Sequence, residues 1–208
     1  MRMKKLAQKC LGFIQLTRPV NVLIAGLSIF LAGYLCGIGD AGTKLLAACL
    51  VGMLITAAAN GINDYYDIEI DRINKPRRPF PSGRLRRGEG LVLVAISFAA
   101  ALVLAGRINP AALGLTLFSG FLLYWYSARL KRTVLWGNLA VSLVTALAFV
   151  FGGIAVGRFR YALVPAVFSF LMHFGREIIK DMEDVGGDAA LNAGTFPVVH
   201  GLAPARRL

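Results

Sequence analysis

Six long runs of apolar residues alternate with short polar segments along the chain. Each run is close to the roughly 20 residues that an α-helix needs to cross the apolar core of a bilayer. The pattern therefore predicts an all-α fold, a polytopic transmembrane helix bundle. Its six spans are expected at about 19–39, 43–62, 91–107, 111–126, 134–156 and 161–179.

The two ends of the chain differ from the predicted bundle. Residues 1–18 are basic and amphipathic, which predicts a lead-in lying at the membrane interface. The apolar run after it is too long for the core of a signal peptide and shows no small-residue cleavage site, so we interpret it as the first span. We assign residues 19–200 to a transmembrane domain and 201–208 to a tail.

Charge supports the membrane assignment and predicts an orientation. The chain is 57% hydrophobic and 16% charged, whereas a soluble domain averages about 25% charged residues. A net charge of +12 would suggest nucleic acid in a soluble protein, but these cations cluster beside the spans. Nineteen of the 23 lysines and arginines fall on the side that holds the N-terminus, which predicts a cell-membrane protein with a cytoplasmic N-terminus and no nucleic-acid partner. The three cysteines form no disulfide or zinc pattern.

The stretch 60–84, NGINDYYDIEIDRINKPRRPFPSGR, holds the first unusual cluster of acidic residues. On a continuous helix Asn63, Asp67 and Asp71 would share one face, and Asp64 would lie one turn before Asp67. Like charges on one stripe repel one another, and Mg²⁺, which prefers oxygen ligands, relieves that repulsion. Cations and prolines follow at once, so the stretch suggests a site for a metal-bound phosphate. The alternative is an ordinary solvated helix end.

A second acidic cluster follows the sixth span. Glu177, Asp181, Asp184 and Asp188 are spaced to line one helical stripe, and Gly186-Gly187 is expected to end or bend the helix. Both clusters lie at the cytoplasmic end of an even-numbered span. Two facing carboxylate stripes can hold Mg²⁺ ions that neutralise a departing diphosphate, with nearby cations binding the remaining oxygens. The membrane setting favours a lipidic substrate with its charged head at this rim.

At these residues the sequence resembles the UbiA superfamily of intramembrane prenyltransferases. Asn63, Asp67 and Asp71 fit its N-x-x-x-D-x-x-x-D motif, Asp184 and Asp188 fit its D-x-x-x-D motif, and 124-YWYSARLKR-132 and 16-LTRPVN-21 are similar to two further segments. The resemblance implies metal ligands at Asn63, Asp64, Asp67, Asp71, Asp181, Asp184 and Asp188. It also implies that Asp67, Asp184, Lys131 and Tyr124 carry the chemistry, with Tyr124 facing the reactive end of the prenyl chain.

Within the family, the sequence looks most similar to the archaeal branch that makes the second ether bond of membrane lipids. That branch transfers a geranylgeranyl group from its diphosphate to geranylgeranylglyceryl phosphate. The implied partners are a prenyl diphosphate donor, a lipidic acceptor that bears a phosphate, and membrane lipids. The substrate-binding candidates are Arg18, Asn21, Asn60, Arg72, Arg77, Arg78, Arg132, Arg176 and Lys180. For the arginines the alternative is plain anchoring on the cytoplasmic side, and for Asn60 it is a helix–helix hydrogen bond.

The family pattern implies about nine spans, of which this sequence has six. The resemblance therefore leads us to expect a chain shortened at its C-terminus, with an incomplete wall around the prenyl pocket.

Four other functions remain as alternatives. An aromatic prenyltransferase of the same family, acting on a quinone or tetrapyrrole precursor, would share both acidic motifs. A CDP-alcohol phosphotransferase would need a D-G-x-x-A-R signature that the sequence lacks. A non-catalytic carrier or channel is disfavoured because the acidic groups lie on one side only. An inactive shortened product is the fourth.

Among the remaining polar residues, Tyr65, Tyr66 and Tyr126 are candidates to stack on a prenyl cation or to lie in an interfacial belt. His173 is expected to be an interhelical histidine with its hydrogen bonds made.

Overall fold

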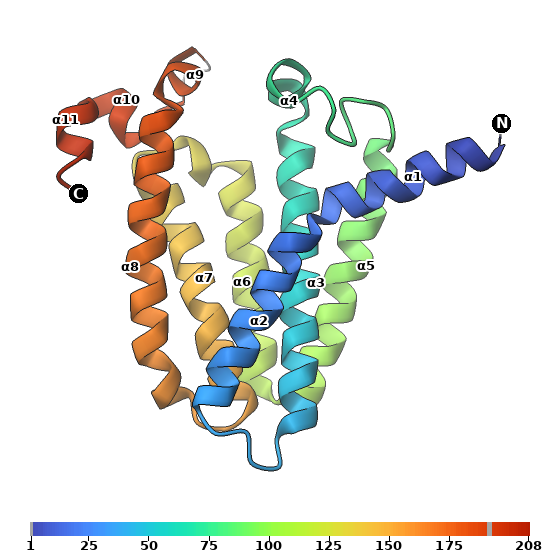
Figure 1. The fold of residues 1–208 in the computed structure, drawn as a ribbon, viewed down its shortest axis with the longest axis vertical. Coiled ribbons are helices and arrows are strands. Elements are labelled where there is room, and N and C mark those ends of the chain that lie inside the picture. Colours follow the sequence, from blue (N-terminus) through green and yellow to red (C-terminus); the bar gives the residue numbers. More distant parts are fainter. Residues whose placement is uncertain (1, 191–192) are drawn as a thin grey trace.

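A computed structural model describes residues 2–190 and 193–208, and this part of the chain is a bundle of long helices (Figure 1). The long helices are α2 (Pro19–Leu35), α3 (Gly42–Tyr66), α5 (Arg87–Ile108), α6 (Pro110–Ala128), α7 (Trp136–Ala155) and α8 (Phe159–Glu183). Five are long and apolar enough to cross a membrane, and α2 supplies a sixth when it is taken with α1 (Arg2–Thr17) across a bend of 43°. The predicted all-α, multi-pass fold is confirmed.

Shorter helices lie at one end of the bundle, beside the acidic motifs. They are α4 (Ile68–Asn74), the 3-10 turn η1 (Leu130–Arg132), α9 (Val185–Ala190), α10 (Phe196–His200) and α11 (Leu202–Ala205). Figure 1 shows α4 and α9 at the same end as both chain termini, whereas the α2–α3 and α7–α8 connections lie at the opposite end. The fold thus brings two segments more than 100 residues apart to one rim.

Local sequence signals explain where several helices begin. Pro19 and Pro110 are first residues of α2 and α6, where the missing N–H of proline carries no cost. Asn109 caps α6 by accepting a hydrogen bond from the backbone N–H of Ala112 at 2.8 Å. The chain therefore breaks at Asn109-Pro110, between the spans predicted at 91–107 and 111–126.

The second and sixth spans continue further than hydropathy predicts. α3 ends at Tyr66 instead of residue 62, and α8 ends at Glu183 instead of residue 179. Hydropathy marks only the part of a helix that lies in lipid, whereas helical hydrogen bonding continues into the polar turns beyond it. As a result, Asn63, Asp64 and Asp181 start from rigid helical positions.

The core of the bundle depends on close helix contacts. Ile29 and Val51 are each 2% exposed and pack with Phe151, which is 6% exposed. At Gly152 on α7, an added Cβ would lie 2.3 Å from the backbone oxygen of Ile29 on α2. Only glycine permits this approach, a common device of helix packing in membranes. The contact fixes α2 against α7 beside the site described below.

The outer surface is strongly apolar. Val164, Phe168 and Ile96 are 77%, 67% and 63% exposed, and such side chains occur on all the long helices. A soluble monomer rarely exposes contiguous apolar surface of this extent, so these faces contact lipid in a multi-pass membrane protein.

Candidate active site

The first acidic motif spans the junction between α3 and α4. The expected continuous helix is interrupted at Asp67, which has φ −95° and ψ 4° and lies between the two helices. The spacing survives, because the Asp67 N–H donates to the carbonyl of Asn63 at 3.1 Å and the Asp71 N–H donates to the carbonyl of Asp67 at 2.8 Å. The side chains of the motif therefore do not lie along the one continuous helix that we predicted, because the helix is interrupted at Asp67.

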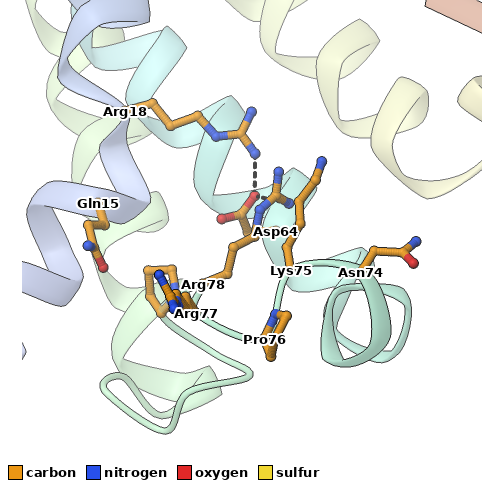
Figure 2. Close-up of a pocket in the computed structure, with 9 residues that line it drawn as sticks. Gln15, Arg18, Asp64, Asn74, Lys75, Pro76, Arg77 and Arg78 are labelled. Carbon is orange, nitrogen blue, oxygen red and sulfur yellow. Dashed lines mark hydrogen bonds and ion pairs between the residues drawn. The ribbon is translucent and has the colours of Figure 1, made fainter. Parts of the chain in front are cut away.

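Two arginines neutralise the buried carboxylates of this motif. The side chains of Asp64 and Asp71 are 3% and 5% exposed. Arg78 Nη1 lies 3.0 Å from Asp64 Oδ1 and 2.6 Å from Asp71 Oδ2, and Arg18 also donates to Asp64. Figure 2 shows Arg18 and Arg78 converging on Asp64, the first from the α1–α2 junction and the second from the loop after α4. Arg18 adopts a left-handed backbone conformation with φ 52°, an uncommon one for a residue with a Cβ, at the bend that directs it toward Asp64.

Lys131 connects the loop between α6 and α7 to the same motif. Its Nζ donates to Asp67 Oδ1 at 2.5 Å and to Asn63 Oδ1 at 3.3 Å, and Asn63 Nδ2 donates to Asp67 Oδ2 at 3.1 Å. Burial lowers the pKa of Lys131, and the charge of Asp67 opposes that effect. Three carboxylates of the first motif thus face three cations, Arg18, Arg78 and Lys131.

The second motif is split between α8, its end and α9. Asp181 on α8 accepts a hydrogen bond from Asn138 Nδ2 of α7 at 2.8 Å. Asp188 on α9 accepts one from Thr195 Oγ1 at 3.0 Å, and burial raises the pKa of Asp188, with the charge of nearby Asp184 adding to the rise. α8 stops before the exposed Asp184, so the helix breaks two residues earlier than Gly186-Gly187, which lie inside α9.

The oxygen donors of the two motifs suit a hard cation such as Mg²⁺, because carboxylate and amide oxygens are its preferred ligands. Within residues 2–190 and 193–208, however, no group of three or more His, Cys, Asp or Glu side chains is close enough together to hold a metal ion. The first motif makes ion pairs instead. Tyr126 lies between the motifs, within electrostatic range of Asp67 on one side and of Asp181 and Glu177 on the other.

A cavity of about 630 Å³ lies among the helices below the motifs. Its walls come from α2, α3, α6, α7 and α8, and they are mainly apolar. Asn21 and Asn60 line it, as expected for pocket residues. Asn60 Nδ2 also donates to the carbonyl of Thr17 at 2.8 Å, so this residue both lines the cavity and joins two helices. We call this space the chamber.

A second cavity, of about 490 Å³, lies outside the first motif and is strongly basic. Figure 2 shows the residues that line it. They are Gln15, Arg18, Asp64, Asn74, Lys75, Pro76, Arg77, Arg78 and Pro79. We call this space the basic pocket. Arg18 and Asp64 line it, whereas Asn21 and Asn60, about one turn away on the same helices, line the chamber. The Arg18–Asp64 pair therefore separates two adjoining cavities.

Several predicted substrate-binding residues lie outside both cavities. Arg72 pairs at 2.8 Å with Glu69, and both side chains are more than half exposed. Arg132 is exposed, and its carbonyl accepts a hydrogen bond from the Gly194 N–H at 3.0 Å. Lys180 lies 3.2 Å from Glu177 on the surface of α8. These positions leave the three residues at the rim, where they can meet a charged headgroup.

Tyr124, expected to face the reactive end of the prenyl chain, lies at the surface of α6. It is 50% exposed, is absent from the chamber walls, and its hydroxyl lies 3.1 Å from that of Tyr66. Tyr126, two residues further along the helix, points in a nearly opposite direction and is near Asp67, Asp181 and Glu177. Of the chamber residues on α8, three had no assigned substrate role in the sequence: Ser169, His173 and Glu177. Their spacing of four residues on α8 was the available signal.

Comparisons with known proteins give the family. The UbiA prenyltransferase family profile matches residues 22–208. The digeranylgeranylglyceryl phosphate synthase of Methanothermobacter thermautotrophicus is 42% identical over 190 residues, which are 91% of this chain and 67% of that protein. The synthase of Methanopyrus kandleri is 40% identical over 202 residues, covering 95% and 72% of the two chains.

Solved structures agree with this assignment. A digeranylgeranylglyceryl phosphate synthase in membranes superposes with a TM-score of 0.82 at 34% identity, over 93% of this chain and 70% of that one. A UbiA homologue from Archaeoglobus fulgidus, bound to DMAPP and Mg²⁺, has a TM-score of 0.76 at 22% identity, over 94% and 71% of the chains, and supports the fold alone. The chain, an integral membrane helix bundle with both acidic motifs at one rim, belongs to the UbiA prenyltransferase family.

Proposed function

We propose that the protein transfers a geranylgeranyl group from geranylgeranyl diphosphate to the free hydroxyl of geranylgeranylglyceryl phosphate, forming an ether bond. The observation that carries the proposal is the pairing of two adjoining cavities, a long apolar chamber and a basic pocket, on either side of the first acidic motif. Relatives about 40% identical are named as synthases of digeranylgeranylglyceryl phosphate, which supports the same reaction here.

The chamber suits the hydrocarbon chain of the donor. Its volume of about 630 Å³ lies within the range of small-molecule pockets, roughly 300–1,000 Å³, and apolar residues such as Ile24, Val144 and Leu147 line it. A prenyl chain in this space would direct its diphosphate toward Asp67 and Asp181 at the rim. Bound Mg²⁺ would supply charge neutralisation for the leaving diphosphate.

The protein's own residues have separate tasks in this proposal. Asn63, Asp64, Asp67, Asp71, Asp181, Asp184 and Asp188 would hold the cations, and Lys131 would exchange part of its contact with Asp67 for a diphosphate oxygen. Charge-assisted hydrogen bonds of this kind are about twice as strong as neutral ones. Tyr126 would present its ring near the carbon that becomes positive.

The basic pocket suits the phosphate of the acceptor. Lys75, Arg77 and Arg78 meet there beside Arg18, against a single carboxylate, Asp64. Arg78 and Arg18 are already paired with Asp64. In the described part of the chain, no carboxylate forms an ion pair with Lys75 or Arg77, the other two cations of the pocket. A phosphate bound by Lys75 and Arg77 would place the rest of the acceptor at the boundary between the two cavities. We also propose that this rim faces the cytoplasm, because most lysines and arginines lie on its side.

The test offers radiolabelled geranylgeranyl diphosphate, with Mg²⁺, to the full chain in detergent or lipid, together with one of two acceptors. Label is expected on geranylgeranylglyceryl phosphate and not on a hydroxylated aromatic acid. Arg77→Gln should raise the KM for the phosphate acceptor about 10-fold or more, since a lost charged hydrogen bond costs about 1.5–3 kcal/mol, and should leave the KM for the donor unchanged. Label on the aromatic acceptor alone would replace this function with that of an aromatic prenyltransferase.

A further inference from the structure

His173 is a chamber residue for which the fold provides no structural partner. It lies on α8, one helical turn deeper than Glu177, and lines the chamber while remaining partly accessible. In the part of the chain that the structure describes, its imidazole makes no hydrogen bond to another residue, unlike Asn60 or Asn138, which do. The expected interhelical histidine with satisfied hydrogen bonds is therefore not what the structure shows, and a polar ring facing an apolar cavity needs another explanation.

The chamber walls offer few groups that can accept a proton. The lining residues from α2, α3, α6 and α7 are all uncharged, and α8 contributes the ionisable ones, His173, Arg176 and Glu177. An arginine does not release its proton in proteins. Glu177 is held by Arg176 at 2.7 Å and by Lys180 at 3.2 Å, so cations already engage both of its carboxylate oxygens. His173 is the remaining base, and histidine is the side chain that most often changes charge near neutral pH.

The proposed reaction releases a proton that such a base can accept. The C1–O bond of the donor breaks and both of its electrons leave with the diphosphate. The acceptor's hydroxyl oxygen then bonds to C1, and its proton must go elsewhere. A side chain near the hydroxyl that accepts this proton would promote the attack on C1.

The depth of His173 fits this role. With a rise of about 1.5 Å per residue, His173 lies roughly 12 Å along α8 from Asp181, and Glu177 lies halfway between them. A diphosphate held at the level of Asp181 would place C1 of its prenyl chain one to two turns deeper, at the level of Glu177 and His173. The carboxylate of Glu177, which is about 6 Å away across one helical turn, would stabilise the imidazolium that forms.

We propose that His173 is the proton acceptor for the attacking hydroxyl, a role that rests on the proposed transfer to an alcohol. An unprotonated imidazole nitrogen takes the hydroxyl proton as the ether bond forms, and the imidazolium then releases it to water. The chamber thus holds both the hydrocarbon chain of the donor and the base for the acceptor.

The experiment compares His173→Gln with His200→Gln, the same substitution in α10, where the side chain is exposed and outside the chamber. The kcat for transfer should fall about 100-fold or more in His173→Gln, within the range of general-base catalysis, while the KM for the donor changes less than about 2-fold. His200→Gln should match the wild type. The kcat of the wild type should fall as the pH is lowered, and this acid limb should be absent in His173→Gln. Added imidazole should partly restore transfer in His173→Ala, a response that a purely structural role would not give.

The proposed function and the role of His173 can be refuted separately. If the wild type transfers no label to the phosphate-bearing alcohol, the proposed function is wrong. If the wild type transfers label and His173→Gln retains its kcat, or His173→Ala loses activity without any rescue by imidazole, the role of His173 is wrong while the function remains.

Discussion

Replacing Arg78 by methionine tests whether its ion pairs with Asp64 and Asp71 balance the charge of the first acidic motif. Arg78 is 21% exposed and bridges Asp64 and Asp71, which are 3% and 5% exposed. Arg18 would still neutralise Asp64 in the variant, but Asp71 would lose the cation that contacts it. Methionine retains much of the length and apolar character of the side chain, so the perturbation is mainly electrostatic.

The expected cost follows from burial. Removing one partner of a buried ion pair costs about 3–5 kcal/mol, and we take the lower end, about 3 kcal/mol, because water reaches part of Arg78. For a chain of this size that corresponds to a fall in Tm of about 6–12 °C. Mg²⁺ should reverse much of the loss, because the variant motif carries one more uncompensated negative charge. At 100 times its Kd a ligand contributes about 2.7 kcal/mol.

The assay is thermal unfolding in detergent micelles, followed by circular dichroism, with and without Mg²⁺. The matched control is Arg72→Met, since the Arg72–Glu69 pair has side chains 59% and 68% exposed and should contribute less than about 1 kcal/mol. If Arg78→Met unfolds within about 1 kcal/mol of the wild type, or no more readily than Arg72→Met, the buried cluster does not have the energetic role described here. A loss that Mg²⁺ leaves unchanged would contradict the metal site in particular.

Two further changes test the site and its scaffold. Asp67→Asn and Asp184→Asn should each reduce Mg²⁺-dependent transfer about 100-fold or more. Membrane insertion, measured by flotation in lipid vesicles, should not change. If either variant retains turnover, that residue does not belong to the metal site. Gly152→Val should lower the stability of the bundle by at least about 1–3 kcal/mol through overpacking, since its Cβ would meet the α2 backbone. Gly106→Val, at a position with no neighbour within 4 Å, is the control, and equal Tm values for the two valine variants would show that the α2–α7 contact can relax.

The candidate site was partly predictable because its residue types are unusual in their setting. Carboxylates at the ends of apolar spans are costly unless they have a function, so the two clusters that contain Asp64, Asp67 and Asp181 could be located in the sequence as candidates. The residues that bind these carboxylates could not be identified from the sequence. The bonds from Arg78 to Asp71, from Lys131 to Asp67 and from Asn138 to Asp181 join residues 7 to 64 positions apart, and no periodicity in one segment encodes which distant cation meets which carboxylate.

The side-chain directions show the same limit. Tyr124 and Tyr126 belong to one short motif, and only the packing of α6 decides that Tyr126 faces the acidic residues while Tyr124 contacts Tyr66. His173 was equally ambiguous, because the sequence could not distinguish a helix interface from a cavity wall. The enclosed space itself, bounded by five helices, exists only when the helices are assembled.

The sequence by itself determined the helical membrane fold, the span positions to within a few residues, and the two acidic motifs. These features follow from local rules, since a hydrocarbon environment requires each segment to satisfy its own backbone hydrogen bonds and excludes unpartnered charge. Tertiary structure alone decided the ion pairs of the first motif, the helix interruption at Asp67, the boundary that Arg18 and Asp64 form between two cavities, and the orientation of His173. Those features depend on distances between helices, which close packing fixes and single segments do not contain.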